Sequence, residues 1–371
     1  MKRRDGHPTW FDRNPKTTLS AVVLVAIVLL DITITALLKV TGNFEPLYSN
    51  ARDLESYYRA PHPIYHHTLV PNIDYDKAIW GGRQYTVRTN SLGFKDAEVV
   101  SVPLSVNERR VLIIGDSFAE GIGIDYSETF TGLLDKKLGA QGIDVLNASA
   151  SSYSPVIHYR KIRHLIENVR LSFDELIAFV DISDPSDEAL LYRLDARENV
   201  ISRQPGVYGA YRAGIKDWMT QRSITVGALR SLARNVHYAG RDQQKAINQR
   251  NAQWTIDDDL YASYGRAGLE LCAQYMTMLK HLLDANGIKL TVVVHPWPDQ
   301  IYRRDHPSRQ NVFWKQWTEE HGALFVDLFP IFMNYSPNSV ETIQALFISG
   351  DVHWNAAGHR IVADALLGGF P

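Results

Sequence analysis

The sequence predicts an α/β fold, a three-layer α/β/α sandwich around a five-stranded parallel sheet, preceded by one membrane-spanning helix. Three observations lead to this prediction. Five short apolar runs alternate with stretches of helical periodicity, which is typical of a parallel sheet covered on both faces. The first of these runs stops abruptly at Gly115-Asp116-Ser117, as a buried strand does at a turn that presents a side chain. A separate apolar run near the N-terminus is long enough to cross a bilayer.

The expected strands are short and almost wholly apolar. They span residues 111–114, 143–147, 175–181, 289–294 and 323–327. Helical spacing and Gly stop signals predict helices at 128–138, 268–286, 310–321 and 356–367. A chain of 371 residues is long enough for one such domain with appendages.

The N-terminal region predicts a cytoplasmic tail at residues 1–16 and a transmembrane helix at residues 17–40. Five Lys and Arg residues precede the apolar run, and such an excess marks the cytoplasmic side. The rest of the chain is then exported, to the periplasm in a bacterium with two membranes. A cleaved signal peptide is the competing interpretation, although the residues around Thr33–Ala36 make a poor cleavage site.

Ser117 is the candidate nucleophile of a catalytic triad. A serine hydroxyl is a weak nucleophile unless a histidine accepts its proton and an acid orients that histidine. Near the C-terminus, Asp351 and His353 stand two residues apart, directly before the last expected helix. We therefore expect Ser117 to attack an acyl carbonyl, His353 to carry the proton and Asp351 to hold the imidazole tautomer. Asp116 is interpreted as a turn residue.

These motifs make the chain resemble the SGNH hydrolases, which are also called GDSL esterases. The Gly-Asp-Ser-Phe turn at 115–118 is similar to the first signature of that family, and Asp351 with His353 is similar to its last. The stretch Asn90-Ser91-Leu92-Gly93-Phe94 resembles one that often precedes the first strand in exported members. The resemblance implies a flavodoxin-like strand order and an SGNH hydrolase-like domain at residues 106–371.

The resemblance also suggests the oxyanion donors. The family carries a glycine in its second block, whose backbone N–H donates, and the matching position here is Ser152. Its third block carries a donating Asn, which this chain replaces by Asp184. An ionised carboxylate cannot donate, so Asp184 has to be protonated, displaced or otherwise employed. Beyond the fourth strand, His295, Trp297 and Asp299 are expected to line the substrate pocket.

The implied function is that of a serine esterase or O-acyltransferase acting on acyl groups, acetyl in particular, of an exported polysaccharide or another envelope ester. The departure at Asp184 favours an alternative, a non-catalytic carbohydrate-binding or scaffold protein of an envelope export complex. A lipase or thioesterase has no distinctive signal in the sequence. No phosphate-binding glycine motif follows any strand, so no cofactor is expected. The net charge of −2 disfavours a nucleic-acid partner.

Two further segments have open roles. Residues 41–105 form an extracytoplasmic approach segment with small β elements. Its histidines, His62, His66 and His67, lack a nearby Cys or carboxylate cluster, so we expect loop histidines and no metal site. Residues 186–264 form an insertion that is either a lid over the site or a helical decoration. Within it, helices are expected near 215–219 and 226–232 and a mobile loop at 241–259.

Overall fold

The computed structural model describes residues 10–41, 55, 57–203, 223–239 and 246–368. The described residues divide into two compact units. One contains the N-terminal helices together with residues 223–239, and the other contains the sheet. The approach segment, from residue 55 onward, lies in the same unit as the sheet.

The sheet has the five expected strands. They are β5 (Arg109–Ile114), β6 (Ile143–Asn147), β7 (Glu175–Phe179), β10 (Lys289–Val294) and β11 (Leu324–Asp327). Their order across the sheet is β11-β10-β7-β5-β6, and all neighbouring pairs are parallel. This is the flavodoxin-like order, so the predicted fold class is confirmed. The strand β5 lies inside the sheet, which explains why its apolar run is continuous.

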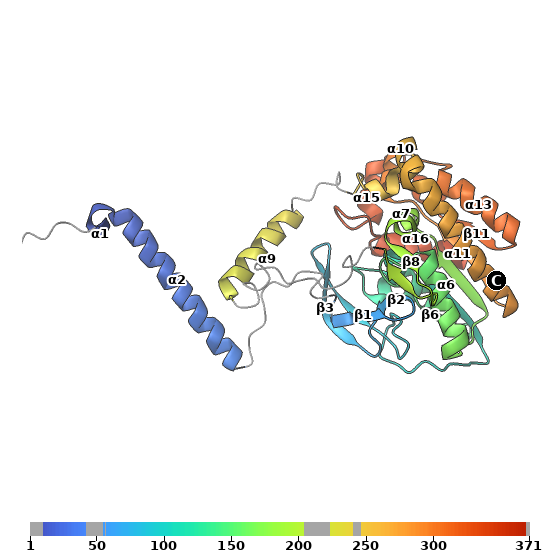
Figure 1. Ribbon diagram of the computed structural model, residues 1–371, viewed down its shortest axis with the longest axis horizontal. Helices are drawn as coiled ribbons and strands as arrows, with labels where there is room; N and C mark the ends of the chain where they lie inside the picture. Colours follow the sequence, from blue (N-terminus) through green and yellow to red (C-terminus); the bar gives the residue numbers. More distant parts are fainter. Residues whose placement is uncertain (1–9, 42–54, 56, 204–222, 240–245, 369–371) are drawn as a thin grey trace, which may run out of the picture. The chain divides into compact units, whose positions relative to one another are not determined.

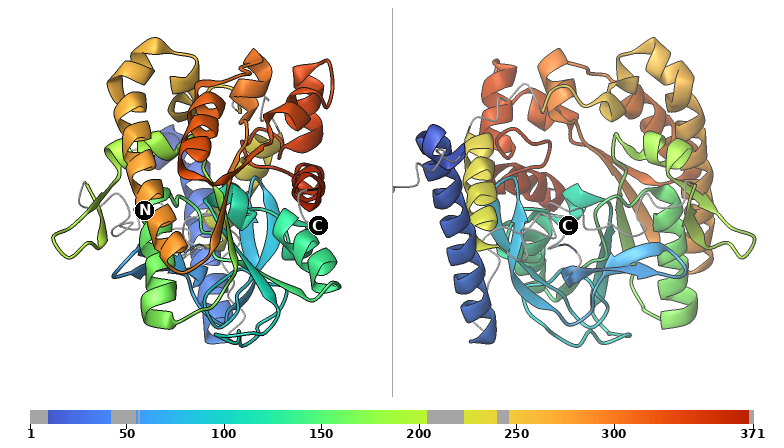
Figure 2. Two further views of the ribbon diagram at one scale, coloured as in Figure 1. Left: turned by 90° about the vertical axis from the view of Figure 1, so that its right-hand side faces the viewer. Right: turned by 60° about the vertical axis from the view of Figure 1, so that its left-hand side comes forward.

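Helices cover both faces of the sheet and complete the three layers (Figures 1 and 2). On one face, α5 (Phe130–Gly139) packs against α16 (Ala356–Leu367). On the other face, α11 (Arg266–Ala285) packs against α6 (Pro155–His164) and α13 (Arg309–His321). The expected helices at 128–138, 268–286, 310–321 and 356–367 are confirmed, with ends that differ by at most two residues.

Short elements connect or extend this core. Three antiparallel hairpins pair β1 (Arg59–His62) with β2 (His66–Leu69), β3 (Asp74–Trp80) with β4 (Arg83–Arg88), and β8 (Tyr192–Leu194) with β9 (Val200–Ser202). The short helical turns are α4 (Ser117–Glu120), η1 (Tyr126–Glu128), η2 (Leu165–Val169), α7 (Asp184–Leu190), η4 (Arg250–Thr255), α10 (Asp258–Leu260), η5 (Tyr261–Gly265), α12 (Pro298–Arg303), α14 (Phe329–Met333) and α15 (Ser339–Leu346).

Residues 250–260 of the insertion are more ordered than their polar sequence suggests. The expected mobile loop at 241–259 is wrong from Arg250 onward, because η4 and α10 occupy that part. Trp254 explains the difference, since its buried indole N–H donates to the carbonyl oxygen of Ile182 at 2.6 Å. The helix expected near 215–219 lies outside the described residues. The helix expected at 226–232 lies within α9 (Ile224–Ala239), which belongs to the N-terminal unit.

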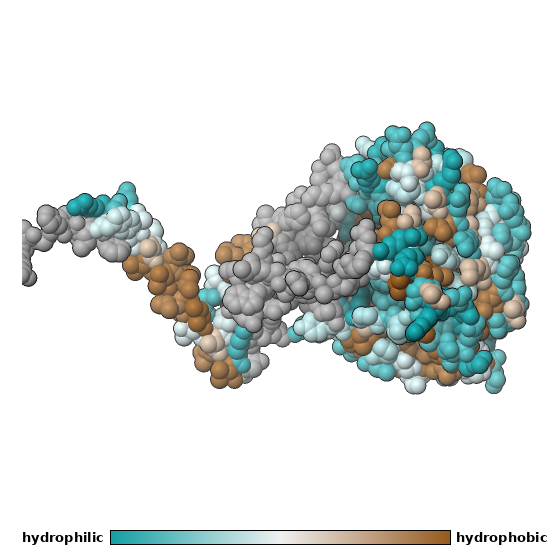
Figure 3. Space-filling view, in the orientation of Figure 1, coloured by the Kyte–Doolittle hydropathy of each residue, from teal (hydrophilic) through white to brown (hydrophobic). Residues whose placement is uncertain are grey.

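The N-terminal unit is built on α2 (Pro15–Val40), which follows the short α1 (Trp10–Arg13). Side chains along α2 expose apolar surface, which is visible along the helix in Figure 3. Among the described helices, α2 is the one long and apolar enough to cross a membrane, as a single anchor or a signal sequence would. Its Asp31 carboxylate accepts the backbone N–H of Thr225, at 2.8 Å, at the start of α9.

Candidate active site

Ser117 stands at the carboxyl end of β5, where the strand turns sharply into α4. Gly115 permits this turn, because a Cβ there would lie 2.6 Å from the Cβ of Ala119 and 2.8 Å from that of Phe179. Asp116 caps α4, since its Oδ1 accepts the N–H of Phe118 at 2.9 Å. The turn therefore presents the Ser117 hydroxyl beyond the sheet edge.

His353 and Asp351 reach the same edge from the loop before α16. Asn355 caps that helix by accepting the N–H groups of Ala357 and Gly358. The Nδ1 atom of His353 lies 2.5 Å from Asp351 Oδ1, and its Nε2 lies 2.8 Å from Ser117 Oγ. Because Asp351 accepts the Nδ1 proton, neutral His353 has its lone pair on Nε2, where it can accept the Ser117 proton.

The environment of this group keeps Asp351 ionised. Burial alone would raise the pKa of Asp351, but the charge of His353 and its hydrogen bonds, helped by Trp80, lower it to about 2. Trp80, at the end of β3, stands edge-on to the His353 ring with centroids 5.2 Å apart. Its indole N–H makes no regular hydrogen bond to any described residue. It nevertheless lies near enough to the Asp351 carboxylate to help lower the pKa of that group. Trp80 thus brings the approach segment into the site.

The loop after β6 lies beside the serine turn. The N–H of Ala150 donates to the carbonyl oxygen of Gly115 at 3.3 Å, and the N–H of Ser151 donates to Glu120 Oε2 at 2.6 Å. Ser152 has a φ of 62°, the left-handed region that glycine adopts freely and other residues adopt at a cost of roughly 1 kcal/mol. Ser152 therefore takes the backbone conformation that a glycine at this position would allow.

Asp184 begins α7, after β7. Its Oδ2 accepts the backbone N–H of Asp181 at 2.9 Å, and its Oδ1 has no partner among the described residues. Burial, with the nearby carboxylates of Asp181 and Asp116, raises the pKa of Asp184 well above its ordinary value. These surroundings favour the neutral form of Asp184, in which Oδ1 can carry the proton and donate it.

His295 and Trp297, which were expected to line the substrate pocket, are both buried next to the serine turn. His295 is completely buried between Phe118 and Trp354, with ring centroids 4.5 and 4.7 Å away. Trp297 donates its indole N–H to Asp181 Oδ2 at 2.7 Å, and Asp299 accepts from the insertion through Gln253 Nε2. His295 and Trp297 pack against Phe118 of the serine turn, whereas the buried Asp299 is bound by the insertion and by Arg303.

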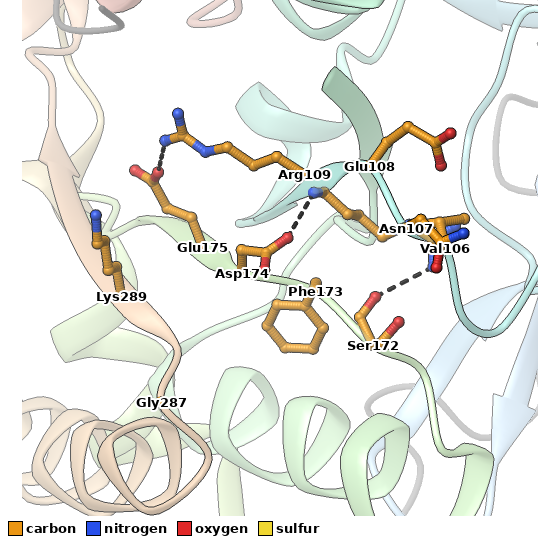
Figure 4. A pocket seen from close by; sticks show the side chains of 11 residues that line it. Val106, Asn107, Glu108, Arg109, Ser172, Phe173, Asp174, Glu175, Gly287 and Lys289 are labelled. Atoms are coloured by element: carbon orange, nitrogen blue, oxygen red, sulfur yellow. Dashed lines mark hydrogen bonds and ion pairs between the residues drawn. The ribbon is translucent and has the colours of Figure 1, made fainter. Parts of the chain in front are cut away.

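No three His, Cys, Asp or Glu side chains among the described residues are arranged to hold a metal ion. A pocket of about 610 Å³ lies away from Ser117, at the amino ends of β5, β7 and β10. Figure 4 shows its charged lining, in which Arg109 pairs with Glu175 at 2.6 Å and Lys289 stands nearby. Because Ser117 follows the carboxyl end of β5, this pocket is not part of the candidate active site.

No protein-family model matches the chain, and no curated protein matches it. Solved structures do match the chain. TesA is 14% identical, with a TM-score of 0.39, over 70% of this chain and 97% of its own. A catalytic mutant of Axe2, an acetylxylan esterase from Geobacillus stearothermophilus, is 17% identical with a TM-score of 0.39, over 71% and 94%. A member of the lipolytic protein G-D-S-L family from Veillonella parvula is 13% identical with a TM-score of 0.38, over 71% and 98%.

Each of these matches covers about 70% of the chain. The strand order and the distances among Ser117, His353 and Asp351 are properties of this chain itself.

Sequence reasoning missed three residues that contact the site: Trp80, Glu120 and His67. Glu120 is buried in α4 and forms a paired hydrogen bond with Arg59 of β1, at 2.8 Å for each contact. A charged residue three positions after the candidate nucleophile, inside an apolar context, was the available signal for Glu120. No pattern in the sequence points to Trp80 or His67 in this role, since both act from hairpins distant in the chain.

Proposed function

We propose that this protein is a serine esterase or O-acyltransferase that acts on ester-linked acyl groups, acetyl in particular, of an exported or cell-envelope polysaccharide. The observation that carries the proposal is the continuous chain of hydrogen bonds from Asp351 through His353 to Ser117. A nucleophile, a base and an orienting acid in this arrangement perform acyl transfer in unrelated folds.

The reaction begins when Ser117 Oγ attacks the ester carbonyl carbon and His353 Nε2 accepts the hydroxyl proton. The carbonyl oxygen becomes an oxyanion, which the backbone N–H groups of Ser117 and Ser152 stabilise, and Asp184 in its protonated form adds a third donor. The tetrahedral intermediate collapses when the sugar alcohol leaves with the proton from His353, and the acyl group remains on Ser117. Water, or the hydroxyl of a second sugar, then attacks the acyl-enzyme with His353 as base, which releases the acid or the new ester.

The proposed location follows from the N-terminal helix. Since basic residues precede α2, we place the N-terminus in the cytoplasm, α2 across the inner membrane as an uncleaved anchor, and the sheet domain in the periplasm. A reporter that is active only outside the cytoplasm, fused after Pro371, should be active. Activity of a cytoplasm-only reporter at the same position would remove both this topology and the envelope substrate.

Turnover of a small activated ester tests the chemistry. The purified protein should hydrolyse p-nitrophenyl acetate, and the Ser117→Ala variant should not. If the wild-type protein has no activity on this ester or on acetylated polysaccharides, while it binds the polysaccharide, the alternative of a carbohydrate-binding or scaffold protein replaces the enzyme. Acetyl release from polysaccharide, compared with acetyl transfer to an added oligosaccharide, separates hydrolase from transferase.

A further inference from the structure

His67 holds the peptide group that carries the proposed oxyanion donor. The carbonyl oxygen of Ser151 and the N–H of Ser152 belong to one peptide group, which is planar and rigid. His67 Nε2 lies 2.7 Å from that carbonyl oxygen. Fixing the oxygen therefore fixes the direction in which the Ser152 N–H points.

The same peptide group needs to be held, because Ser152 has its φ in the left-handed region. Without support, a serine there relaxes toward negative φ, and the peptide plane turns with it. Two further bonds flank the plane. Tyr192 Oη donates to the carbonyl oxygen of Ser152 at 3.0 Å, and the N–H of Ser151 donates to Glu120 at 2.6 Å.

A short relay sets the tautomer of His67. Its Nδ1 lies 2.8 Å from Nδ1 of His66, and His66 Nε2 lies 2.9 Å from Ser202 Oγ on β9. Since Nε2 of His67 donates to a carbonyl, which can only accept, its Nδ1 in the neutral ring accepts from His66 Nδ1–H. His66 Nε2 then accepts the hydroxyl proton of Ser202. Burial lowers the pKa of both histidines, that of His67 to about 3, so the pair is neutral at physiological pH.

We propose that His67 is a positioning residue for the oxyanion hole, and that His66 and Ser202 hold it in the donating tautomer. The inference rests on the proposed esterase function. His67 does not touch the substrate. It aims the Ser152 N–H at the developing oxyanion, and its bond to the carbonyl oxygen polarises the peptide and strengthens that N–H as a donor. The approach segment and the β8–β9 hairpin would then both contribute to catalysis.

A matched pair of polar substitutions tests the proposal. In His67→Gln the amide nitrogen can occupy the position of Nε2 and donate to Ser151, whereas in His67→Asn it reaches only the position of Nδ1. With p-nitrophenyl acetate, we expect His67→Asn to lower kcat roughly ten- to a hundredfold with KM nearly unchanged, which is less than the loss of a complete oxyanion donor. His67→Gln should retain kcat within a few fold of wild type.

His62→Asn is the matched control. His62 lies in the same approach segment, stacked on Tyr65 with ring centroids 3.6 Å apart, and its Nδ1 accepts the N–H of Ile64 within its own hairpin. The His62→Asn variant should have the kcat of wild type. Equal kcat for His67→Asn and His67→Gln, or an equal loss in His62→Asn, would overturn the positioning role.

A second measurement does not depend on activity. Hydrogen–deuterium exchange of the loop at residues 148–155 should be faster in His67→Asn than in wild type and restored in His67→Gln. Unchanged exchange in His67→Asn would contradict the inference even if the protein proved inactive on esters. If the wild-type protein does not turn over the ester, or if the Ser117→Ala variant still does, the proposed function itself is wrong.

Discussion

Two loops at the carboxyl edge of the same sheet hold aspartates whose pKa values shift in opposite directions. In the loop before α16, Asp351 faces His353, whose charge and N–H groups lower the pKa of Asp351 to about 2. In the turn after β7, burial and neighbouring carboxylates raise the pKa of Asp184 well above its ordinary value. Asp184 is buried and the Asp351 side chain is 13% exposed, and burial by itself raises the pKa of both. The neighbours set the direction, because a histidine lowers the pKa of Asp351 whereas other carboxylates add to the rise in the pKa of Asp184.

The largest expected effect comes from breaking the hydrogen-bonded chain that ends on Asp351. Ser117→Ala and His353→Ala should each lower kcat/KM for p-nitrophenyl acetate by several orders of magnitude, and the double variant should be little worse, because the residues act as a unit. His281→Ala, at an exposed position on α11, is the control and should match wild type. If the fold-loss of kcat/KM in the double variant equals the product of the two single fold-losses, the residues act independently, and the triad is contradicted.

Asp351→Asn should lower kcat by less than Ser117→Ala does, because Asn can still accept from one side of the ring but does not stabilise the imidazolium. It should also change the pH dependence of stability. The lowered pKa of Asp351 stabilises the folded state above its ordinary value of 3.8, and this contribution disappears as the pH falls through about 2. The free energy of unfolding should therefore differ from wild type by about 2 kcal/mol at pH 5 and converge near pH 2. A constant difference across that range would contradict this ionisation.

Trp80→Phe removes the indole N–H near Asp351 and keeps an aromatic ring beside His353. We expect kcat to fall roughly three- to tenfold, about the worth of one hydrogen bond. The Trp314→Phe variant changes another buried tryptophan, which packs against Trp317 on α13, and it should retain wild-type kcat. Equal kinetics of wild type and Trp80→Phe would show that the N–H does not act on the Asp351 carboxylate.

Asp184→Asn is expected to have the smallest effect on turnover and to preserve or slightly increase it, because an amide donates permanently where the carboxyl must stay protonated. For a carboxyl with a raised folded pKa, ionisation in the unfolded chain lowers wild-type stability as pH rises above about 3.8. Thermal melts should therefore show a stabilisation in Asp184→Asn that grows as the pH rises above about 4. Asp364→Asn, at an exposed position on α16, should show none. A loss of activity at all pH values would mean that Asp184 works as a carboxylate.

The sequence was sufficient for the parts of the molecule that depend on local pattern. The strand β5 ends where its apolar run ends, and α16 spans the residues whose helical spacing predicted it. The order of Ser117, Asp351 and His353 likewise predicted which side chains the fold brings together. Motifs that end strands and begin helices place side chains at one edge of a parallel sheet without further information.

The supporting residues could not be predicted in the same way. His295 and Trp297 follow β10, so position alone suggested a pocket, but their burial depends on Phe118 and Trp354 from distant parts of the chain. Trp80 and His67 reach the site through hairpins whose docking is decided by tertiary contacts such as that between Arg59 and Glu120. The charge state of Asp184 depends on the same kind of long-range neighbourhood, which periodicity does not encode.

The most direct test of the central claim is covalent labelling by a fluorophosphonate, which reacts with a serine hydroxyl that a neighbouring base activates. Mass spectrometry of the intact protein and of its peptides should find one adduct, on Ser117, and the adduct should be lost in His353→Ala. The Asp351→Asn variant should label more slowly than wild type. A wild-type protein that stays unlabelled while a known serine esterase in the same tube is modified, or an adduct that persists in Ser117→Ala, would contradict the triad.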